Sequence, residues 1–303
     1  RKEFQDLWKK INRKAIYQIQ IDSQKLINDS ISCVERTAKE RNNKFVETLT
    51  YKLAESSMKD EVSFDELKSK DAFGKMTSKI ENSTLSIHSQ VQYDLVGNIA
   101  EDTNLTRKTV AQILKGINAF VFVQFKLNPE AFIREMCRII NEQQASMVIQ
   151  GLKYNPLKEG YPENDIFVSN ENIPLRSFKA DRHIWDYVVT DSDNERKFVE
   201  ELDGADEVIV YAKLPDRFQI PTPFGNYNPD WAIAFDKDKV RQVYFVAETK
   251  GSMSDADLRD KEKRKIESAT KFFATLNEEN QSLGDAVKYA VIDSFSSLMQ
   301  LVK

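Results

Sequence analysis

The sequence predicts a chain of the α+β or α/β class with two parts, a mainly helical domain followed by a mixed domain of helices and strands. Apolar residues recur at helical spacing through much of residues 1–150, whereas several short apolar runs follow residue 190. The charge balance also changes: residues 1–150 hold 23 Lys and Arg against 20 Asp and Glu, and the remainder holds 21 against 28. Between the two parts, Gly and Pro interrupt residues 151–189, which are typical of a connecting region.

Composition narrows the class of protein. A length of 303 residues is enough for two domains, and 41% hydrophobic with 30% charged residues is typical of a soluble globular protein. No apolar run reaches the roughly 18 residues of a membrane span, so no membrane partner is expected. Two distant cysteines, Cys33 and Cys137, and only two histidines argue against a disulfide framework and a zinc site. These features favour a reducing, cytoplasmic location.

Helices are expected over three stretches of the first part. Apolar residues recur every three or four positions over residues 4–11, from Ser23 to about residue 34, and over 131–150, with Ser23 as a candidate helix cap. Residues 15–21 alternate apolar and polar side chains, which indicates a strand.

Residues 96–116 predict a unit similar to a helix-turn-helix. Two short helices are expected on either side of a turn near Asn104, and Thr106 would cap the second helix. Four residues of the second helix would then project toward DNA bases or phosphates: Arg107, Lys108, Thr109 and Gln112. The same pattern also suits a helical hairpin with solvated basic residues, or contact with the DNA backbone or another subunit.

The second part, residues 190–303, predicts the order helix, strand, strand, strand, helix, strand. Ser192 and Glu195 form a capping-box pattern that opens the first helix, at 194–203. The other elements are expected at 207–214, 230–236, 243–250, about 255–277, and 286–293.

Acidic residues occur where two of these strands would meet. One strand begins with Asp230 and the next ends with Glu248-Thr249-Lys250. Symmetric pairing about the loop between them sets Asp230 opposite Glu248, with Cβ atoms about 5 Å apart. Two such carboxylates, with the Thr249 carbonyl, would suit Mg²⁺, and Mn²⁺ is expected to substitute. Lys250 shares a strand face with Glu248 and would position a water or stabilise charge on a phosphate.

Two further residues are candidates for this site. Glu195 lies on the apolar face of its predicted helix, so it is either the capping residue or another carboxylate aimed at the site. Lys265, in the long helix, neighbours an inward-facing isoleucine and is a candidate DNA phosphate contact. Acidic residues and a lysine at such spacing also occur by chance as ordinary surface charges. The proline before Asp230 and the apolar run before Glu248 favour a site.

These residues carry a resemblance to a known family. Pro229-Asp230 with Glu248-Thr249-Lys250 resembles the PD-(D/E)xK nuclease motif. The longer string KLPDRFQIPTPFGNYNPDWAIAF, with YFVAETKGS after it, is similar to the endonuclease domain of restriction (Res) subunits of type III restriction–modification enzymes. The resemblance covers residues 190–303 and extends to EFQDLWKKINRKAIYQIQI near the start.

The resemblance implies an activity and partners. It implies Mg²⁺-dependent cleavage of double-stranded DNA, in which Asp230, Glu248 and Lys250 carry the hydrolysis and Glu195 is a further match. It also implies an ATP-driven helicase motor upstream in the intact chain, and a separate methyltransferase (Mod) subunit. No GxxxxGK[ST] loop occurs, so no ATP site is expected in this chain. A non-catalytic DNA-binding or docking module with a nuclease-like scaffold, and a repair or mobile-element nuclease, are the alternatives.

Overall fold

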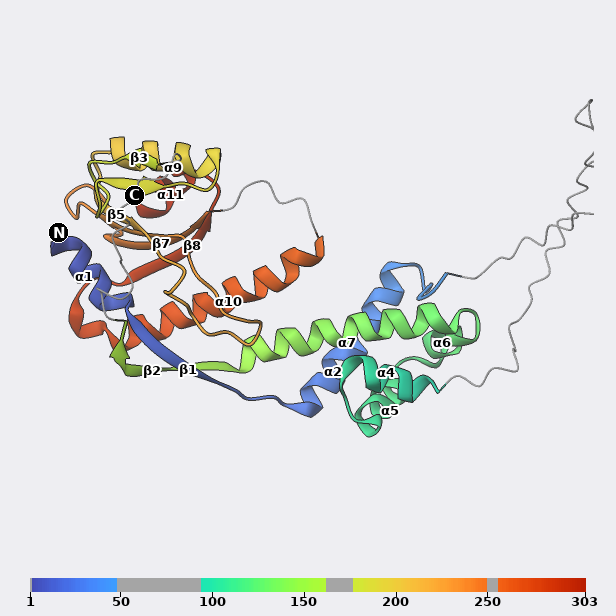
Figure 1. Cartoon of the computed structure of the whole chain (residues 1–303). Coiled ribbons are helices and arrows are strands. Elements are labelled where there is room, and N and C mark those ends of the chain that lie inside the picture. The colour runs from blue at the N-terminus through green and yellow to red at the C-terminus, as the bar shows by residue number, and fades with distance from the viewer. Residues whose placement is uncertain (1, 48–93, 162–176, 250–255) are drawn as a thin grey trace, which may run out of the picture. The chain divides into compact units, whose positions relative to one another are not determined.

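The computed structural model describes residues 2–47, 94–161, 177–249 and 256–303 (Figure 1). The chain forms two compact units: a helical unit of residues 22–144, and a sheet unit that combines residues 1–21 with residues 145–303. This division differs from the predicted one, because the first 21 residues and the predicted connecting region both belong with the C-terminal domain.

The helical unit is built around one apolar core. Its elements are α2 (Ser23–Glu40), α4 (Leu95–Thr103), α5 (Arg107–Gly116), α6 (Ala119–Phe122), the 3-10 helix η1 (Val123–Lys126) and most of α7 (Pro129–Gly151). Asp22, not the predicted Ser23, caps α2, because its carboxylate accepts the N–H groups of Gln24 and Lys25. The core includes Val34, Ile99, Val110, Ile113, Phe132, Ile139 and Ile140.

Helices α4 and α5 form the predicted pair with a short turn. Asn104 adopts the left-handed conformation with φ of 54° and ends α4. The Thr106 side chain accepts the N–H of Thr109 and caps α5, as predicted. Their inward residues join the core of the unit, so packing within the unit accounts for the apolar spacing of this segment.

The sheet unit contains a four-stranded sheet in the order β5-β6-β7-β8. The first three strands are antiparallel, and β8 is parallel to β7. The strands are β5 (Val208–Lys213), β6 (Trp231–Phe235), β7 (Tyr244–Thr249) and β8 (Val287–Ile292), with α9 (Asp193–Gly204) before β5 and α10 (Ala256–Glu279) between β7 and β8. The predicted order of elements from residue 190 to β8 is therefore confirmed.

Helices cover both faces of this sheet (Figure 1). On one face, Ala232 and Val246 share a core with residues of α10 and α1 (Lys2–Ile11). On the other face, Ile233 and Phe245 share a core with residues of α9 and α11 (Phe295–Val302). Alternate strand residues therefore enter opposite cores, as the two-residue period of a strand requires.

Helix α1 joins this unit because its apolar side is buried there. Leu7 and Ile11 are both 0% exposed. The Trp8 ring centroid lies 5.6 Å from that of Phe218, a residue more than two hundred positions later in the chain. The helix was predicted, but its helical spacing gives no indication of which domain it packs against.

Four strands and a helix in this unit complete the fold. The first pair is β1 (Arg13–Ile19) with β2 (Leu152–Gly160), antiparallel, with Tyr17 opposite Tyr154. The second is β3 (Ser177–Lys179) with β4 (Tyr187–Val189). β1 was predicted two residues later, whereas β2, β3, β4 and α11 were not assigned. The sequence of β2, LKYNPLKEG, alternates apolar and polar residues only over its first four positions, before Pro156 interrupts the pattern. Among the described helices, none is both long and apolar enough to cross a membrane.

Candidate active site

The two acidic residues predicted to meet lie at the same end of strands β6 and β7. The ladder pairs Ile233 with Phe245 and Trp231 with Ala247, which is the register that symmetric pairing predicts. Asp230 immediately precedes β6, and Glu248 is the second-last residue of β7. The fold thus delivers one carboxylate from each strand to this end of the sheet.

Asp230 is held by the end of the neighbouring strand. Its N–H donates to the carbonyl of Ala247 at 3.1 Å, and its Oδ2 accepts both the N–H and the hydroxyl of Thr249, at 2.7 and 2.6 Å. Burial raises the pKa of the Asp230 carboxyl above its usual value, the Thr249 hydrogen bonds oppose that shift, and the charge of Glu195 adds to it. The negative charge of Asp230 therefore costs stability in the folded chain.

Glu248 is withdrawn from solvent and held by a tyrosine. Its side chain is 7% exposed, and Oε2 accepts a hydrogen bond from the Tyr227 hydroxyl at 2.7 Å. The Tyr227 hydroxyl in turn lies 2.6 Å from the Tyr289 hydroxyl. Burial raises the pKa of Tyr289, the hydrogen bond with Tyr227 opposes that shift, and the charges of Glu248 and Asp230 add to it. Glu248, Tyr227 and Tyr289 therefore form one hydrogen-bonded group.

Glu195 lies in the first turn of α9, and the capping box with Ser192 is only half formed. Its N–H donates to the Ser192 hydroxyl at 3.2 Å, whereas its carboxylate accepts the N–H of Asp191 at 3.0 Å, not that of Ser192. The same carboxylate is 3.0 Å from the Lys213 ammonium, and its charge acts on Asp230. Glu195 is thus a helix-capping residue that also contributes negative charge near Asp230.

Lys213 was missed by sequence reasoning. It ends β5, and its Nζ lies 2.6 Å from Asp191 and 3.0 Å from Glu195. Burial lowers the pKa of Lys213, but hydrogen bonds to these two carboxylates outweigh that effect and raise it. Its charge also lowers the pKa of Asp230. The signal for it was a lysine at the end of an apolar run, VIVYAK, which resembles the run that ends in Glu248.

Three further residues were predicted for this site, and the structure describes two of them, Lys265 and Thr249. Lys250 lies outside the described residues. Lys265 is half-buried on α10, and its Nζ donates to the carbonyl of Asn226 at 2.9 Å. Thr249 serves Asp230 through its N–H and hydroxyl, while its carbonyl stays a predicted metal ligand.

The residues of α5 that were predicted to face DNA divide into two pairs. Arg107 is an exposed side chain whose guanidinium donates twice to Asp94, at 2.7 and 2.9 Å. The Thr109 hydroxyl lies 2.9 Å from that of Thr106. Lys108 and Gln112 are both exposed. Arg107 and Thr109 thus have partners within the helical unit, and a role of α5 in DNA contact stays a prediction.

The donor chemistry of the carboxylate pair fits a hard divalent cation. Within the described ranges, no group of three or more His, Cys, Asp or Glu side chains is placed to hold a metal ion. Asp230 and Glu248 nevertheless offer carboxylate oxygens, which Mg²⁺ binds, and Mg²⁺ usually retains several waters beside one or two carboxylates. A cation would also offset the electrostatic cost indicated by the raised pKa of Asp230.

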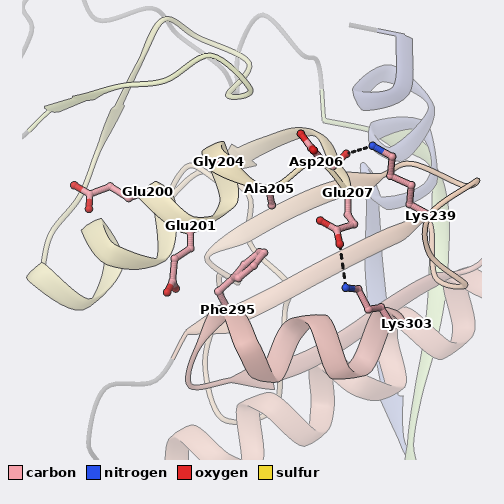
Figure 2. Close-up of a pocket in the computed structure, with 9 residues that line it drawn as sticks. All are labelled: Glu200, Glu201, Gly204, Ala205, Asp206, Glu207, Lys239, Phe295 and Lys303. Carbon is pink, nitrogen blue, oxygen red and sulfur yellow. Dashed lines mark hydrogen bonds and ion pairs between the residues drawn. The ribbon is translucent and has the colours of Figure 1, made fainter.

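A cavity of about 780 Å³ lies elsewhere in the unit, at the other end of α9 from Glu195 (Figure 2). Both of its lysines have partners: the Lys303 ammonium is 3.0 Å from Glu207, and Lys239 donates to the carbonyl of Asp206 at 2.9 Å. Asp230 precedes the first residue of β6, whereas Lys239 follows the opposite end of that strand. The cavity is therefore not part of the carboxylate site.

Comparison with known proteins bears directly on this region. Residues 181–295 match the family model described as an endonuclease domain. That range contains Glu195, Asp230 and Glu248. Across 323 aligned residues, the chain is 24% identical to the Res subunit of the type III restriction–modification enzyme EcoPI, from Escherichia phage P1. Nearly the whole chain is similar to part of a type III Res subunit.

A second relative gives the same result. The Res subunit of the type III restriction–modification enzyme EcoP15I, from Escherichia coli, is also 24% identical over 323 residues. Both alignments include 99% of this chain but only 31% of the relative, so the chain spans about a third of the length of these subunits. No solved structure matches the chain.

Proposed function

We propose that the sheet unit is a Mg²⁺-dependent DNA endonuclease, in which Asp230 and Glu248 bind the ion at one end of the sheet. The observation that carries this proposal is the placement of two carboxylates at the same end of adjacent strands, where Glu248 is buried and Asp230 is half-buried. Desolvation and the charge of Glu195 both disfavour the ionised form of Asp230. Buried acidic groups with perturbed pKa values cluster at functional sites. The match of residues 181–295 to an endonuclease domain supports the same activity.

Each residue has an assigned part in phosphodiester hydrolysis. Both hydrogen bonds from Thr249 go to Oδ2 of Asp230, so we assign Oδ1 to the ion. When bound, Mg²⁺ supplies positive charge that activates a water and offsets charge developing on the scissile phosphate. We assign Lys250 to that water or to the phosphate, because residues two apart in an extended chain share a face with each other. The negative charge of Glu195 disfavours ionisation of Asp230, and the positive charge of Lys213 partly offsets that effect.

The substrate and partners of this chain are proposed from its relatives and from the family resemblance. We assign double-stranded DNA as the substrate, a helicase motor to the remainder of the intact protein, and a methyltransferase (Mod) subunit as partner. The chain aligns with 31% of the length of the EcoPI Res subunit, and the motor is assigned to the part that does not align. Exposed Lys108 and Gln112 on α5, and Lys265 on α10, are the proposed contacts with DNA.

The test compares Asp230→Asn with Asp236→Asn, which changes the aspartate at the other end of β6. Nicking of supercoiled plasmid is measured with Mg²⁺ and with Mn²⁺, and circular dichroism checks the fold. Because Asp230 is assigned as a ligand itself, we expect Asp230→Asn to lower nicking by more than the 10–100-fold typical of losing a ligand's hydrogen-bond partner. Asp236→Asn should retain wild-type nicking.

Two outcomes would contradict the proposal. Equal nicking by Asp230→Asn and wild type would remove Asp230 from the active site. DNA binding in EDTA with no cutting under either metal would favour the non-catalytic docking module.

A further inference from the structure

We propose that Tyr227 and Tyr289 form a hydrogen-bonded pair that positions the Glu248 carboxylate for the divalent ion. This inference rests on the proposed function and concerns the ion-binding carboxylate of the same site. The two tyrosines are positioning residues, because they act on the ion through Glu248 and not by direct contact.

Three separate segments bring these side chains together. Tyr289 of β8 pairs with Val246, two residues before Glu248 on β7, so the Tyr289 and Glu248 side chains share a face of the sheet. Tyr227 lies in the loop before β6, and its N–H and carbonyl both bond to the backbone of Ile220, at 2.9 and 2.7 Å. Tyr227 is 5% exposed. The hydroxyl of Tyr227 is therefore held in place by backbone pairing as well as by burial.

The direction of the hydrogen bonds follows from counting protons. A metal-binding Glu248 is a carboxylate, which only accepts hydrogen bonds, so the single proton of the Tyr227 hydroxyl is donated to it. The 2.6 Å contact between the two phenols then has Tyr289 as the donor. The result is a series of two hydrogen bonds, from Tyr289 to Tyr227 and from Tyr227 to Glu248, in which each bond polarises the next.

The nature of the donor suits an ion-binding carboxylate. A buried carboxylate needs hydrogen-bond partners, because its desolvation is otherwise expensive. A phenol supplies such a bond without bringing a positive charge that would compete with a cation. Since the bond is made to Oε2, Tyr227 also restricts rotation of the carboxyl group about its last single bond. Partners of this kind typically orient metal ligands and strengthen binding.

Ring packing is separable from the hydroxyl network. The Tyr289 ring stacks on Phe273 at 5.0 Å, and the Tyr227 and Tyr289 rings meet edge to face at 6.3 Å. Phenylalanine retains these ring contacts and removes only the hydroxyl. The chain also offers a matched control in Tyr154, which is likewise 5% exposed in the same core and donates its hydroxyl to the carbonyl of Pro221 at 2.8 Å.

The experiment measures Mn²⁺ binding to the 303-residue chain by electron paramagnetic resonance, without DNA. We expect Tyr227→Phe to weaken Mn²⁺ binding by about 10–100-fold, and Tyr289→Phe to weaken it by less, because Tyr289 is one bond further from Glu248. Tyr154→Phe should bind Mn²⁺ as the wild type does, although it also loses a buried hydrogen bond. Wild-type affinity in Tyr227→Phe, or an equal loss in Tyr154→Phe, would overturn the inference.

A second arm tests whether Tyr227 acts through Glu248. In a Glu248→Gln background, adding Tyr227→Phe should cause no further loss of Mn²⁺ affinity, because the two changes disable one unit. An additive loss would show that Tyr227 acts elsewhere and would overturn the inference. A wild-type chain that binds Mn²⁺ and cuts DNA, with Tyr227→Phe unchanged, refutes only this inference. A wild-type chain that binds no Mn²⁺ overturns the proposed function as well.

Discussion

The two units of this chain hold their charged side chains in different environments. In the sheet unit, Glu248 is 7% exposed, and burial raises the pKa of Asp230. In the helical unit, Arg107 and Asp94 form a two-bonded ion pair with side chains 63% and 56% exposed. Exposed pairs contribute little to stability and cost little, whereas buried carboxylates reduce stability unless they are compensated. The difference shows that the chain carries an electrostatic cost at the end of β6 and β7, which is where the active site is proposed.

The units also differ in how the chain builds them. The helical unit is one continuous stretch, residues 22–144, whereas the sheet unit combines segments from both sides of it. Local sequence patterns indicated α2, α4, α5, α7 and the turn of the first unit, although not the short helices α6 and η1. They did not indicate that the first helix of the chain completes the core of the second.

The largest expected effect tests this assignment of helix α1. Leu7 is 0% exposed in the core beneath the sheet, so Leu7→Ala should destabilise the sheet unit by about 2–5 kcal/mol, through lost burial and a cavity. Hydrogen exchange under mild urea should show faster exchange in β7 and α10, with α5 unchanged. Ile16→Ala, at a residue 53% exposed in the following strand, is the control and should have little effect. Equal loss of protection in α5 would mean that the two units unfold together.

A smaller effect tests the cost of the buried carboxylate. The Asp230 carboxyl is harder to ionise in the folded chain, so its contribution to stability is complete at acid pH and is lost as pH rises through the folded-state pKa. Without metal, Asp230→Asn should therefore raise the unfolding temperature at pH 7–8. A change of about 1 kcal/mol corresponds to about 2–4 °C in a domain of 150–250 residues, so a thermal scan resolves the sign of this effect.

Calorimetry in EDTA across pH 4–8 measures this difference. The difference between the wild type and Asp230→Asn should shrink as pH falls toward 4, which is close to the pKa of about 3.9 of an unfolded aspartate. Asp236→Asn should follow the wild type throughout. An Asp230→Asn chain that is less stable at neutral pH would show that the carboxylate is structural.

The smallest expected effect concerns helix α5. If α5 contacts DNA phosphates, Lys108→Ala should reduce the slope of log affinity against log salt by about 1. Arg107→Ala should change it less, because the Arg107 guanidinium is already engaged by Asp94. Fluorescence anisotropy with duplex DNA over a series of salt concentrations measures both slopes. No change in either variant would leave α4 and α5 as a structural hairpin, and equal changes would mean that Arg107 leaves Asp94 to bind phosphate.

Much of the fold follows from local patterns in the sequence. The apolar runs predicted strands β5 to β8 and their order along the chain. The loop between β6 and β7 predicted how the residues of these two strands pair. Thr106 and Ser192 marked two helix starts through their own hydrogen bonds to nearby N–H groups. Such features are determined within a few residues, where side-chain period and capping chemistry dominate. Strand β2 was missed because its alternation is short and ends at Pro156, and its partner β1 lies more than a hundred residues away in the chain.

The sequence by itself determined which residue types stand at the ends of β6 and β7, and so placed Asp230 and Glu248 near one another. Only the tertiary structure decided what surrounds them. Tyr289 meets Tyr227 across 62 positions of the chain, and Lys213 reaches Glu195 across 18. Hydrogen bonds act only over about 3 Å, so such partners depend on how whole elements pack, and no local period or motif encodes that packing.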